Sequence, residues 1–521
     1  MDKRKGILNI GTSVVSRIIL LLAALYVRRL LIIYIGNEVN GLNSLYASII
    51  GLLSVAELGV GSAIIYSMYR PIVDGEKRKV AALYCLYRRL YRMIGAVIFI
   101  AGLAVMPFLP RLIGDYDSLD VNVYSTFLLT LISVVLSYLY SAKTSLIEAH
   151  KDNYINVGIA TVSRLLRYAL QIAALLITRS YIAYLICQII ETLVIWAMTE
   201  HAVRKLHPDI IRMRERMDSS ATAEVTRNIK AMFMHKIGSI LVGSVDSMII
   251  SAFIGVTVLG MYGNYAAIAG AMTGILALFF TPLTSVIGHL CATNKPAEIK
   301  KYFNHFYCIN YMLGVIFFLG YYAVIDDLIV ILFGSDLEMQ RAVPFIIALN
   351  TFISYMRYTP LLFRDATGTF YYDRWKPVAE GITNLLLSIF LVKMLPAEYG
   401  VVGVIVATII TTLLICDIIE PHIIFRYVFK EPAKEFYIRN YCGIGIFAVC
   451  LIIVDKIRLS IPGNMAEILV NGMISLAISA SLMIVLSLLN KTFRQAARIV
   501  IAQCAEWIRK IHEKGNRGDG Q

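Results

Sequence analysis

Long apolar runs recur along the whole chain, and they constrain its fold more than any other feature. Each run holds about 20 residues, the length that an α-helix needs to cross the hydrocarbon core of a bilayer. Apolar residues make up 58% of the 521 residues and charged residues only 16%, whereas soluble domains average about 25% charged residues. Because a helix satisfies its own backbone hydrogen bonds within lipid, the sequence predicts an all-α integral membrane protein.

The apolar runs and the turn residues between them predict about fourteen membrane-spanning helices. Basic residues gather in alternate connections, above all in residues 204–230, whereas the other connections are short and hold acidic residues such as Asp115, Asp326 and Asp327. Because Lys and Arg are enriched in cytoplasmic loops, this alternation predicts that both termini are cytoplasmic. The predicted helices cover residues 8–35, 42–67, 82–109, 122–147, 155–178, 181–203, 231–254, 258–290, 303–325, 341–364, 375–395, 400–425, 439–457 and 465–489.

One short pattern occurs twice. The motif I-G-x4-G-x4-Y-A begins at Ile35 and again at Ile254, an offset of 219 residues (254 − 35). Matches at a single offset indicate an internal duplication, so we predict two pseudo-symmetric six-helix bundles related by an axis along the membrane normal. The predicted parts are an N-terminal bundle over 1–203, a basic cytoplasmic linker over 204–230, a C-terminal bundle over 231–425, an additional helix pair over 426–490, and a cytoplasmic amphipathic helix and tail over 491–521.

Several charged residues lie well inside the predicted spans, where a charge is costly unless it faces protein or water. Arginine dominates this set, and its guanidinium fork binds phosphate oxygens bidentately, so an Arg-lined cavity would accept an anion such as a pyrophosphate. Snorkelling to the surface is the alternative for Arg17 and Arg164, and a structural Asp–Arg pair is the alternative for Asp246. The candidates are Arg17, Arg28, Arg29, Arg164, Arg167 and Arg357 for substrate binding, and Glu57 and Asp246 for ion coupling.

The sequence contains no motif that indicates catalysis. It has no Walker sequence, no G-x-S-x-G and no H-E-x-x-H, and no predicted outer loop exceeds about 20 residues, which leaves little room for an active site. The eight cysteines form no C-x-x-C pair, so neither a metal site nor a disulfide is expected. The chain has a net charge of +14. In a membrane protein, such an excess of Lys and Arg indicates cytoplasmic loops rather than nucleic-acid binding. We therefore predict a protein that is not an enzyme and has no cofactor.

Five segments resemble a known group of membrane proteins. Residues 36–45 read GNEVNGLNSL, residues 56–61 AELGVG, residues 65–71 IYSMYRP, residues 245–255 VDSMIISAFIG and residues 260–265 GMYGNY. These segments are similar to bacterial polysaccharide flippases, the oligosaccharide-lipid translocases of the multidrug/oligosaccharidyl-lipid/polysaccharide (MOP) exporter superfamily, and the resemblance covers about residues 5–490.

This resemblance implies a fold of fourteen helices, like that of the multidrug exporters and the lipid II flippase, with two six-helix bundles and a final helix pair. It also implies translocation of undecaprenyl-pyrophosphate-linked glycans to the outer leaflet of the bacterial cytoplasmic membrane. Membrane lipids, a polysaccharide polymerase and chain-length proteins are the implied partners. The related lipid II flippase uses cationic residues in its first span, and Arg17, Arg28 and Arg29 occupy comparable positions here.

The sequence therefore predicts a flippase for surface polysaccharide biosynthesis that works by alternating access through an Arg-lined cavity. Two alternatives stay open. One is a cation-coupled drug or metabolite antiporter of the same superfamily, and the other is a non-transporting scaffold of a glycan-assembly complex. The glycan itself is not predicted, because the glycan-binding part varies most among such proteins.

Overall fold

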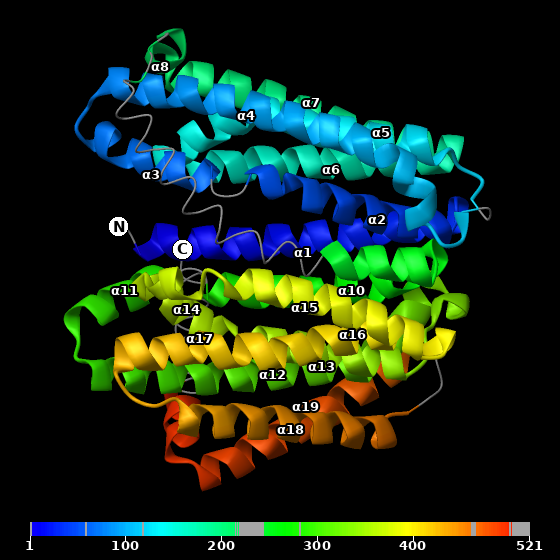
Figure 1. Cartoon of the computed structure of the whole chain (residues 1–521), viewed down its shortest axis with the longest axis vertical. Helices are drawn as coiled ribbons and strands as arrows, with labels where there is room; N and C mark the ends of the chain where they lie inside the picture. The colour runs from blue at the N-terminus through cyan, green and yellow to red at the C-terminus, as the bar shows by residue number, and fades with distance from the viewer. Residues whose placement is uncertain are drawn as a thin grey trace, which may run out of the picture. The chain divides into compact units, whose positions relative to one another are not determined.

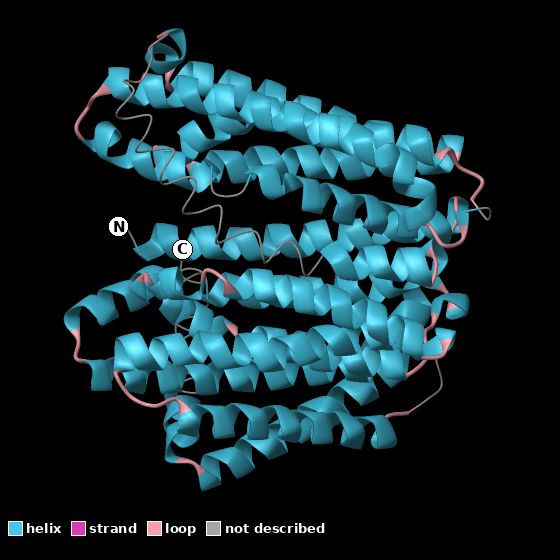
Figure 2. Cartoon of the chain, viewed as in Figure 1, coloured by secondary structure: helices cyan, strands magenta, loops and turns pink. Residues whose placement is uncertain are grey.

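The computed structural model describes residues 3–57, 60–116, 119–213, 244–280, 283–459 and 465–499, with residues 215, 217 and 502. Within these ranges the regular elements are helices and there is no β-strand, as Figure 2 shows. Nine helices among the described residues are long and apolar enough to cross a membrane. The prediction of an all-α, multi-pass membrane protein is confirmed.

Internal contacts divide the chain into two compact units. Unit 1 comprises Met1–Asn264 and Pro377–Ala407, and unit 2 comprises Tyr265–Lys376 and Thr408–Gln521. The boundaries of these units differ from those expected for the bundles over 1–203 and 231–425. The arrangement of the two bundles about a symmetry axis stays a prediction.

Unit 1 is built around four long neighbouring helices. Helix α5 packs against both α4 and α7, and α6 packs against α7 and α1 (Figure 1). The elements of unit 1 are α1 (Lys3–Tyr34), α2 (Asn37–Leu53), η1 (Ser54–Glu57), α3 (Val60–Val73), α4 (Lys77–Val105), η2 (Met106–Leu112), α5 (Val123–Ala149), α6 (Asn153–Thr178), α7 (Tyr181–Leu206), α8 (Pro208–Arg212), the helix Ser244–Phe253, the start of α10 (Val256–Phe280), α15 (Lys376–Met394) after its first residue, η6 (Ala397–Tyr399) and most of α16 (Gly400–Thr411).

Unit 2 is built around α12, which packs against α13, α18 and α19 (Figure 1). Aromatic side chains fill its core, where the rings of Phe352 and Phe447 stack with centroids 3.8 Å apart. Its elements are the rest of α10, α11 (Leu283–Thr293), α12 (Pro296–Phe333), η4 (Ser335–Leu337), α13 (Ala342–Met356), α14 (Tyr358–Thr367), η5 (Thr369–Asp373), the π-helix η7 (Thr412–Cys416), α17 (Asp417–Ile424), the π-helix η8 (Phe425–Phe429), α18 (Lys434–Ile457) and α19 (Met465–Leu489).

Helix starts recur at the same offset of 219 residues as the sequence motif. The pairs of first residues are Asn37 and Val256 for α2 and α10, Lys77 and Pro296 for α4 and α12, Val123 and Ala342 for α5 and α13, and Tyr181 and Gly400 for α7 and α16. The repeat in the sequence therefore corresponds to a repeat of local structure.

The first glycine of each motif copy has a backbone conformation that other residues rarely adopt. Gly36 has a φ of 126° and Gly255 a φ of 131°. In both copies the glycine N–H donates to the carbonyl five residues earlier, that of Leu31 and that of Ile250. Only glycine takes this conformation without strain, which explains why it stands at both turns.

The second glycine of each copy allows α2 and the start of α10 to cross closely within unit 1. A Cβ on Gly41 would lie 1.9 Å from the carbonyl oxygen of Val256, and a Cβ on Gly260 would lie 2.5 Å from that of Asn37. The amide of Asn40 donates to the carbonyl of Gly260 at 3.0 Å. The two contacts are reciprocal, so each helix start rests on the glycine of the other copy.

Asp115, in the connection after η2, caps the N-terminus of α10. Its carboxylate accepts hydrogen bonds from the backbone N–H of Val256 at 2.6 Å and from the Thr257 hydroxyl at 2.7 Å. Partial burial by itself would raise the pKa of Asp115, but the hydrogen bonds from Thr257 and Val256 together outweigh it and hold the pKa below its ordinary value of 3.8. A carboxylate at this position also complements the helix dipole.

Two histidine rings are in contact where α5 and α7 end. The rings of His150 and His207 have centroids 3.9 Å apart, and the buried Nε2 of His207 has no hydrogen-bond partner among the described residues. Burial, and then the neighbouring His150, lower the pKa of His207 below its ordinary value of 6.5, although Asp152 opposes this. The structure therefore favours the uncharged form of His207.

The prediction of an outer loop at Asp326 and Asp327 is wrong, because α12 continues to Phe333. Asp326 is buried and accepts hydrogen bonds from Arg458 at 2.9 Å and from the Tyr265 hydroxyl at 3.3 Å. Such partners let an acidic residue continue an apolar helix, so the charge does not mark the end of the span.

The helix predicted over 42–67 is also corrected. It begins earlier, at Asn37, and divides into α2, η1 and α3. In the expected amphipathic tail, residues 491–499 are helical, and beyond Ile499 only residue 502 is described. The part of the predicted linker that follows Met217 lies outside the described residues.

Candidate functional site

All but one of the predicted site residues belong to unit 1, and Arg357 belongs to unit 2. Arg17 lies on α1, but its side chain is outside the part of the chain that the structure describes. Arg28 and Arg29 follow on the same helix and are half-buried. The remaining candidates lie on η1, α6, the helix Ser244–Phe253 and the junction of α13 and α14.

The guanidinium of Arg28 is held beside the start of α10. Its Nη2 lies 2.8 Å from the point where a Cβ of Gly263 would stand, and the Ser44 hydroxyl lies 3.0 Å from the same point. The missing side chain of Gly263 therefore provides the space that the guanidinium occupies. The buried Nε and Nη2 of Arg28 have no hydrogen-bond partner among the described residues.

Buried donors without an acceptor are costly, by about 1–3 kcal/mol and more for a charged group. Such a guanidinium can therefore gain hydrogen bonds when an acceptor reaches it. An incoming oxyanion would find the charged donors of Arg28 open, whereas the neighbouring Ser44 hydroxyl donates to the Asn40 carbonyl at 3.2 Å. Of the predicted substrate-binding residues, Arg28 has the environment that best fits the role.

Arg164 and Arg167 of α6 share one counter-ion, which is Glu191 of α7. The Nη1 of Arg167 lies 2.8 Å from the Glu191 carboxylate, and the Nε of Arg164 lies 3.6 Å from it. Glu191 is only 7% exposed, and a buried carboxylate requires such partners. Because one carboxylate meets two guanidiniums, the group keeps one positive charge, and the buried Nε of Arg167 has no hydrogen-bond partner within the described residues.

Glu57 lies in a network of hydroxyl groups from α4 and α5. Its carboxylate oxygens accept hydrogen bonds from Tyr91 at 2.8 Å and from Tyr138 at 2.9 Å. Tyr87 donates to the Tyr91 hydroxyl at 2.7 Å, and Ser145 donates to Tyr87 at 3.0 Å. Sequence reasoning did not identify these tyrosines, because 31 tyrosines give no signal for any particular one.

Asp246 lies on the helix Ser244–Phe253 and is half-buried. Tyr262 of α10 is close enough to interact with its charge. Both residues belong to unit 1. The role of Asp246 in ion coupling stays a prediction.

Arg357, at the junction of α13 and α14, is paired with Glu420 of α17. Its Nη2 and Nε donate to the two carboxylate oxygens at 2.7 and 3.2 Å, and Lys376 donates to the same carboxylate. The side chains of Glu420 and Lys376 are 1% and 4% exposed. Neither residue is among the site residues predicted from the sequence, where Lys376 falls at the start of the predicted helix over 375–395 and Glu420 inside the one over 400–425.

Two π-helical segments flank the helix that carries Glu420. Helix α17 lies between η7 and η8 and also carries Asp417, whose carboxylate accepts a hydrogen bond from Asn440 at 3.2 Å. Tyr307 donates to the Asn440 side chain at 2.9 Å. Single π-helical turns often occur at functional sites, and here they adjoin a buried polar cluster.

No protein-family model and no curated protein sequence matches the chain. Solved structures do match. The lipid II flippase MurJ in an inward closed conformation is similar with a TM-score of 0.63 and 13% identity, over 89% of this chain and 96% of that chain. An inward-facing multidrug resistance MATE family transporter of the MOP superfamily matches with a TM-score of 0.57 and 12% identity, over 83% and 98%.

A third match is a MOP superfamily transporter from Pyrococcus furiosus Vc1, described as having a binding pocket of reverse polarity that suggests a different function. Its TM-score is 0.52 and its identity 13%, over 84% of this chain and 94% of that chain. At such identities the matches show the fold, which this chain shares with MurJ and the MATE transporters. The predicted fold class is therefore confirmed, and about fourteen spans are compatible with it.

Proposed function

We propose that the chain is a flippase that moves undecaprenyl-pyrophosphate-linked oligosaccharide repeat units across the bacterial cytoplasmic membrane for surface polysaccharide biosynthesis. It would be a member of the polysaccharide-transport branch of the MOP superfamily and would work by alternating access, with both termini in the cytoplasm. The observation that carries the proposal is the Arg28 guanidinium, which is buried with open donors beside Ser44 and Gly263.

The physical argument concerns the pyrophosphate. Moving its charge into hydrocarbon is very costly, so a flippase has to replace its hydration with fixed donors. Arg28 offers charge-assisted hydrogen bonds that no described residue uses, and such bonds are about twice as strong as neutral ones. The excess positive charge at Arg164 and Arg167 lies in the same unit and adds to the attraction for an anion. The lipid part of the substrate would stay in the bilayer.

Coupling to an ion gradient would use Glu57, with Asp246 as the second candidate. The hydroxyl groups of Tyr91 and Tyr138 donate to the Glu57 carboxylate and hold it in place. Glu57→Gln is therefore expected to reduce transport and to flatten its dependence on the proton gradient. Transport by this variant with the wild-type gradient dependence would contradict the role of Glu57.

The main experiment measures surface glycan in a strain that lacks the native gene and carries Arg28 variants. Arg28→Lys keeps the charge but loses the planar fork, so glycan should fall several-fold rather than vanish. Arg28→Ala should lower it further, and Arg28→Glu, which repels the anion, should abolish it. Membrane levels of each variant are measured by immunoblot.

The matched control is Arg212→Ala, at the exposed end of α8, which should support wild-type glycan. If Arg28→Glu restores glycan as well as the wild type does, the anion-binding mechanism is wrong. Resistance to cationic drugs that depends on Glu57, with no effect on glycan, would instead favour an antiporter.

A further inference from the structure

Five side chains of unit 2 form a continuous row of three aromatic rings with an arginine at each end. The rings of Tyr372 and Tyr427 stack with centroids 3.8 Å apart and planes 9° apart, and Tyr371 meets Tyr372 edge-on at 5.8 Å. The guanidinium of Arg374 lies 4.2 Å from the Tyr371 ring, and that of Arg426 lies 5.6 Å from the Tyr427 ring. We call these five residues the aromatic–arginine ladder.

The ladder lies where two candidate membrane spans have their ends. One span runs over Tyr371–Met394 and the other over Ala397–Phe429, so the ladder joins the first residues of one to the last residues of the other. Element η5, which carries Tyr371 and Tyr372, packs against α17. Element η8, which carries Arg426 and Tyr427, follows α17 directly. Residues at the ends of spans lie at the level of the lipid headgroups.

The rings of the ladder are exposed although they are large and apolar. Tyr371 is 61% exposed, Tyr372 52% and Tyr427 40%, and the neighbouring Trp375 is 65% exposed. Amphipathic rings at the boundary between lipid and water explain such exposure. The two arginines require a further explanation, because an aromatic belt does not itself need stacked cations.

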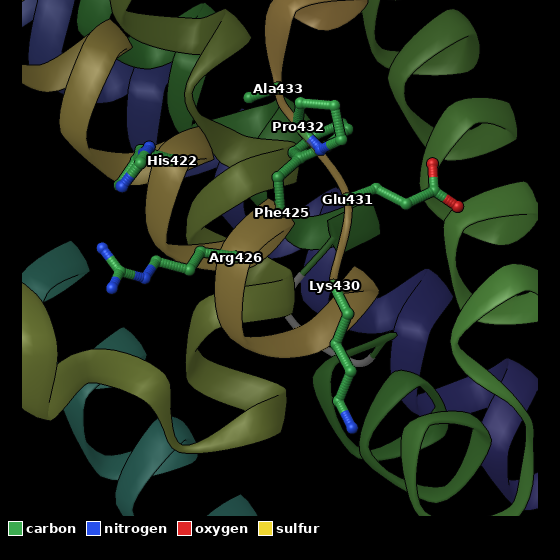
Figure 3. Close-up of a pocket in the computed structure, with 7 residues that line it drawn as sticks. All are labelled: His422, Phe425, Arg426, Lys430, Glu431, Pro432 and Ala433. Atoms are coloured by element: carbon green, nitrogen blue, oxygen red, sulfur yellow. The ribbon is translucent and has the colours of Figure 1, made fainter.

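A pocket of about 410 Å³ adjoins the ladder at Arg426. Figure 3 shows the side chains of Arg426 and His422 extending to the same side of the ribbon, while Lys430 and Glu431 extend in other directions. Glu431 is ion-paired with Lys300, so its charge is already balanced and the pocket keeps the positive charge of Arg426 and Lys430. The lining residues are His422, Phe425, Arg426, Lys430, Glu431, Pro432 and Ala433.

We propose that the aromatic–arginine ladder and the adjoining pocket bind the phosphate headgroup of an anionic glycerophospholipid. A guanidinium stacked on a ring keeps the N–H groups at its edge available, and these bind phosphate oxygens bidentately. The tyrosine rings then lie beside the glycerol region and the first carbons of the acyl chains. This lipid site goes beyond the proposed transport function and does not depend on it.

The test uses fluorescence of Trp375 in the full-length protein reconstituted into vesicles. The chain has three tryptophans, so Trp196→Phe and Trp507→Phe leave Trp375 as the single reporter. Brominated lipids quench a nearby tryptophan, and quenching by brominated phosphatidylglycerol in mixtures with phosphatidylcholine gives the relative binding constant of the two lipids. Each cation near a membrane surface contributes a factor of about five in affinity for an anionic lipid.

We expect the wild-type protein to prefer phosphatidylglycerol clearly over phosphatidylcholine. The relative binding constant should fall about fivefold in Arg426→Gln and again by a similar factor in Arg374→Gln/Arg426→Gln. The variant Arg374→Lys/Arg426→Lys keeps both charges and should retain part of the preference for phosphatidylglycerol. Arg212→Gln, which removes an exposed cation of unit 1, should not change it.

Three results would overturn the proposal. The first is a relative binding constant of the two lipids near one in the wild-type protein. The second is a relative binding constant that Arg374→Gln/Arg426→Gln leaves unchanged, and the third is displacement of the lipid by inorganic phosphate at constant ionic strength. The last result would assign the site to a free anion. Loss of surface glycan in the Arg28 variants has no bearing on this test, so failure of one proposal is distinguishable from failure of the other.

Discussion

Replacing Glu420 by Gln should destabilise the protein strongly, because this buried carboxylate balances the buried Lys376 and the half-buried Arg357. Its side chain is 1% exposed, and it accepts hydrogen bonds from Arg357 at 2.7 and 3.2 Å and also from Lys376. Removing one partner of a buried ion pair costs about 3–5 kcal/mol, since the opposite charge stays buried. We therefore expect Glu420→Gln to lower the free energy of unfolding by about 3–5 kcal/mol.

A double-mutant cycle separates this effect from general damage to the core. Lys376→Met removes the cation that is 4% exposed, so it should cost less in the Glu420→Gln background than in the wild type. The coupling energy between neighbouring charged groups is about 0.5–3 kcal/mol, and we expect the upper half of that range. Glu435→Gln, at the exposed start of α18, is the matched control and should change stability by no more than about 0.5 kcal/mol.

The assay is equilibrium unfolding of the purified protein in mild detergent, followed by circular dichroism as the mole fraction of a denaturing detergent rises. The reasoning is refuted if Glu420→Gln costs less than about 1 kcal/mol, the range of exposed ion pairs, or if the coupling energy is near zero.

The same pair also decides the function of Arg357. The double variant Arg357→Gln/Glu420→Gln removes both charges of the pair. It should be more stable than Glu420→Gln, in which Arg357 and Lys376 both lose this counter-ion, and less stable than Arg357→Gln, in which Lys376 keeps it. If Arg357 only balances Glu420, surface glycan returns in the double variant. If Arg357 binds the transported anion, glycan stays low although the protein is folded.

Three further outcomes are expected from unfolding measurements. Asp115→Asn should lower the free energy of unfolding by about 0.5–2 kcal/mol at neutral pH, as expected for a lost helix cap. Because the pKa of Asp115 is lowered in the folded protein, the wild-type carboxylate should contribute this stability above pH 3.8 and lose it as the pH falls further. His207→Gln should reduce the loss of stability as the pH falls through 6.5, because protonation of this half-buried ring disfavours folding. Exposed His201→Gln should leave that loss unchanged. Gly41→Ala should be strongly destabilising because its Cβ would meet backbone at 1.9 Å, whereas Gly158→Ala, with nothing within 4 Å, should be tolerated; equal effects of the two would contradict the close helix crossing.

Local sequence determined which segments are helices and where many of them begin. The prediction over 465–489 coincides with α19, and the predicted run over 8–35 corresponds to α1. These elements follow from the length of apolar runs and from turn residues, which are properties of neighbouring positions. The glycines at 36 and 255 likewise marked two turns, because the conformation of a single residue limits what can stand there.

Helix ends were predicted less well where a charge lies inside an apolar run. Asp326 was taken as the end of a span, but Arg458, which lies 132 residues away in the sequence, pairs with it and lets α12 continue. The length of an apolar run can be read along the chain. Whether a charge within it has a partner depends on distant residues.

The candidate site shows the same limit. The abundance of interior arginines was visible in the sequence, and it singled out Arg28, whose donors are open, together with Arg357, which is bound to Glu420 63 residues away. The tyrosines around Glu57 gave no signal in the sequence, since their roles depend on α4 and α5 packing against η1 and against each other.

The sequence by itself determined a helical membrane protein with a repeated motif, because hydrophobicity and backbone preference act over a few residues or a single span. Only the tertiary structure decided which charged side chains have a partner among the described residues and which do not. Ion pairs and hydrogen bonds form over about 3 Å, and the residues that come so close are brought together by packing rather than by their order in the chain.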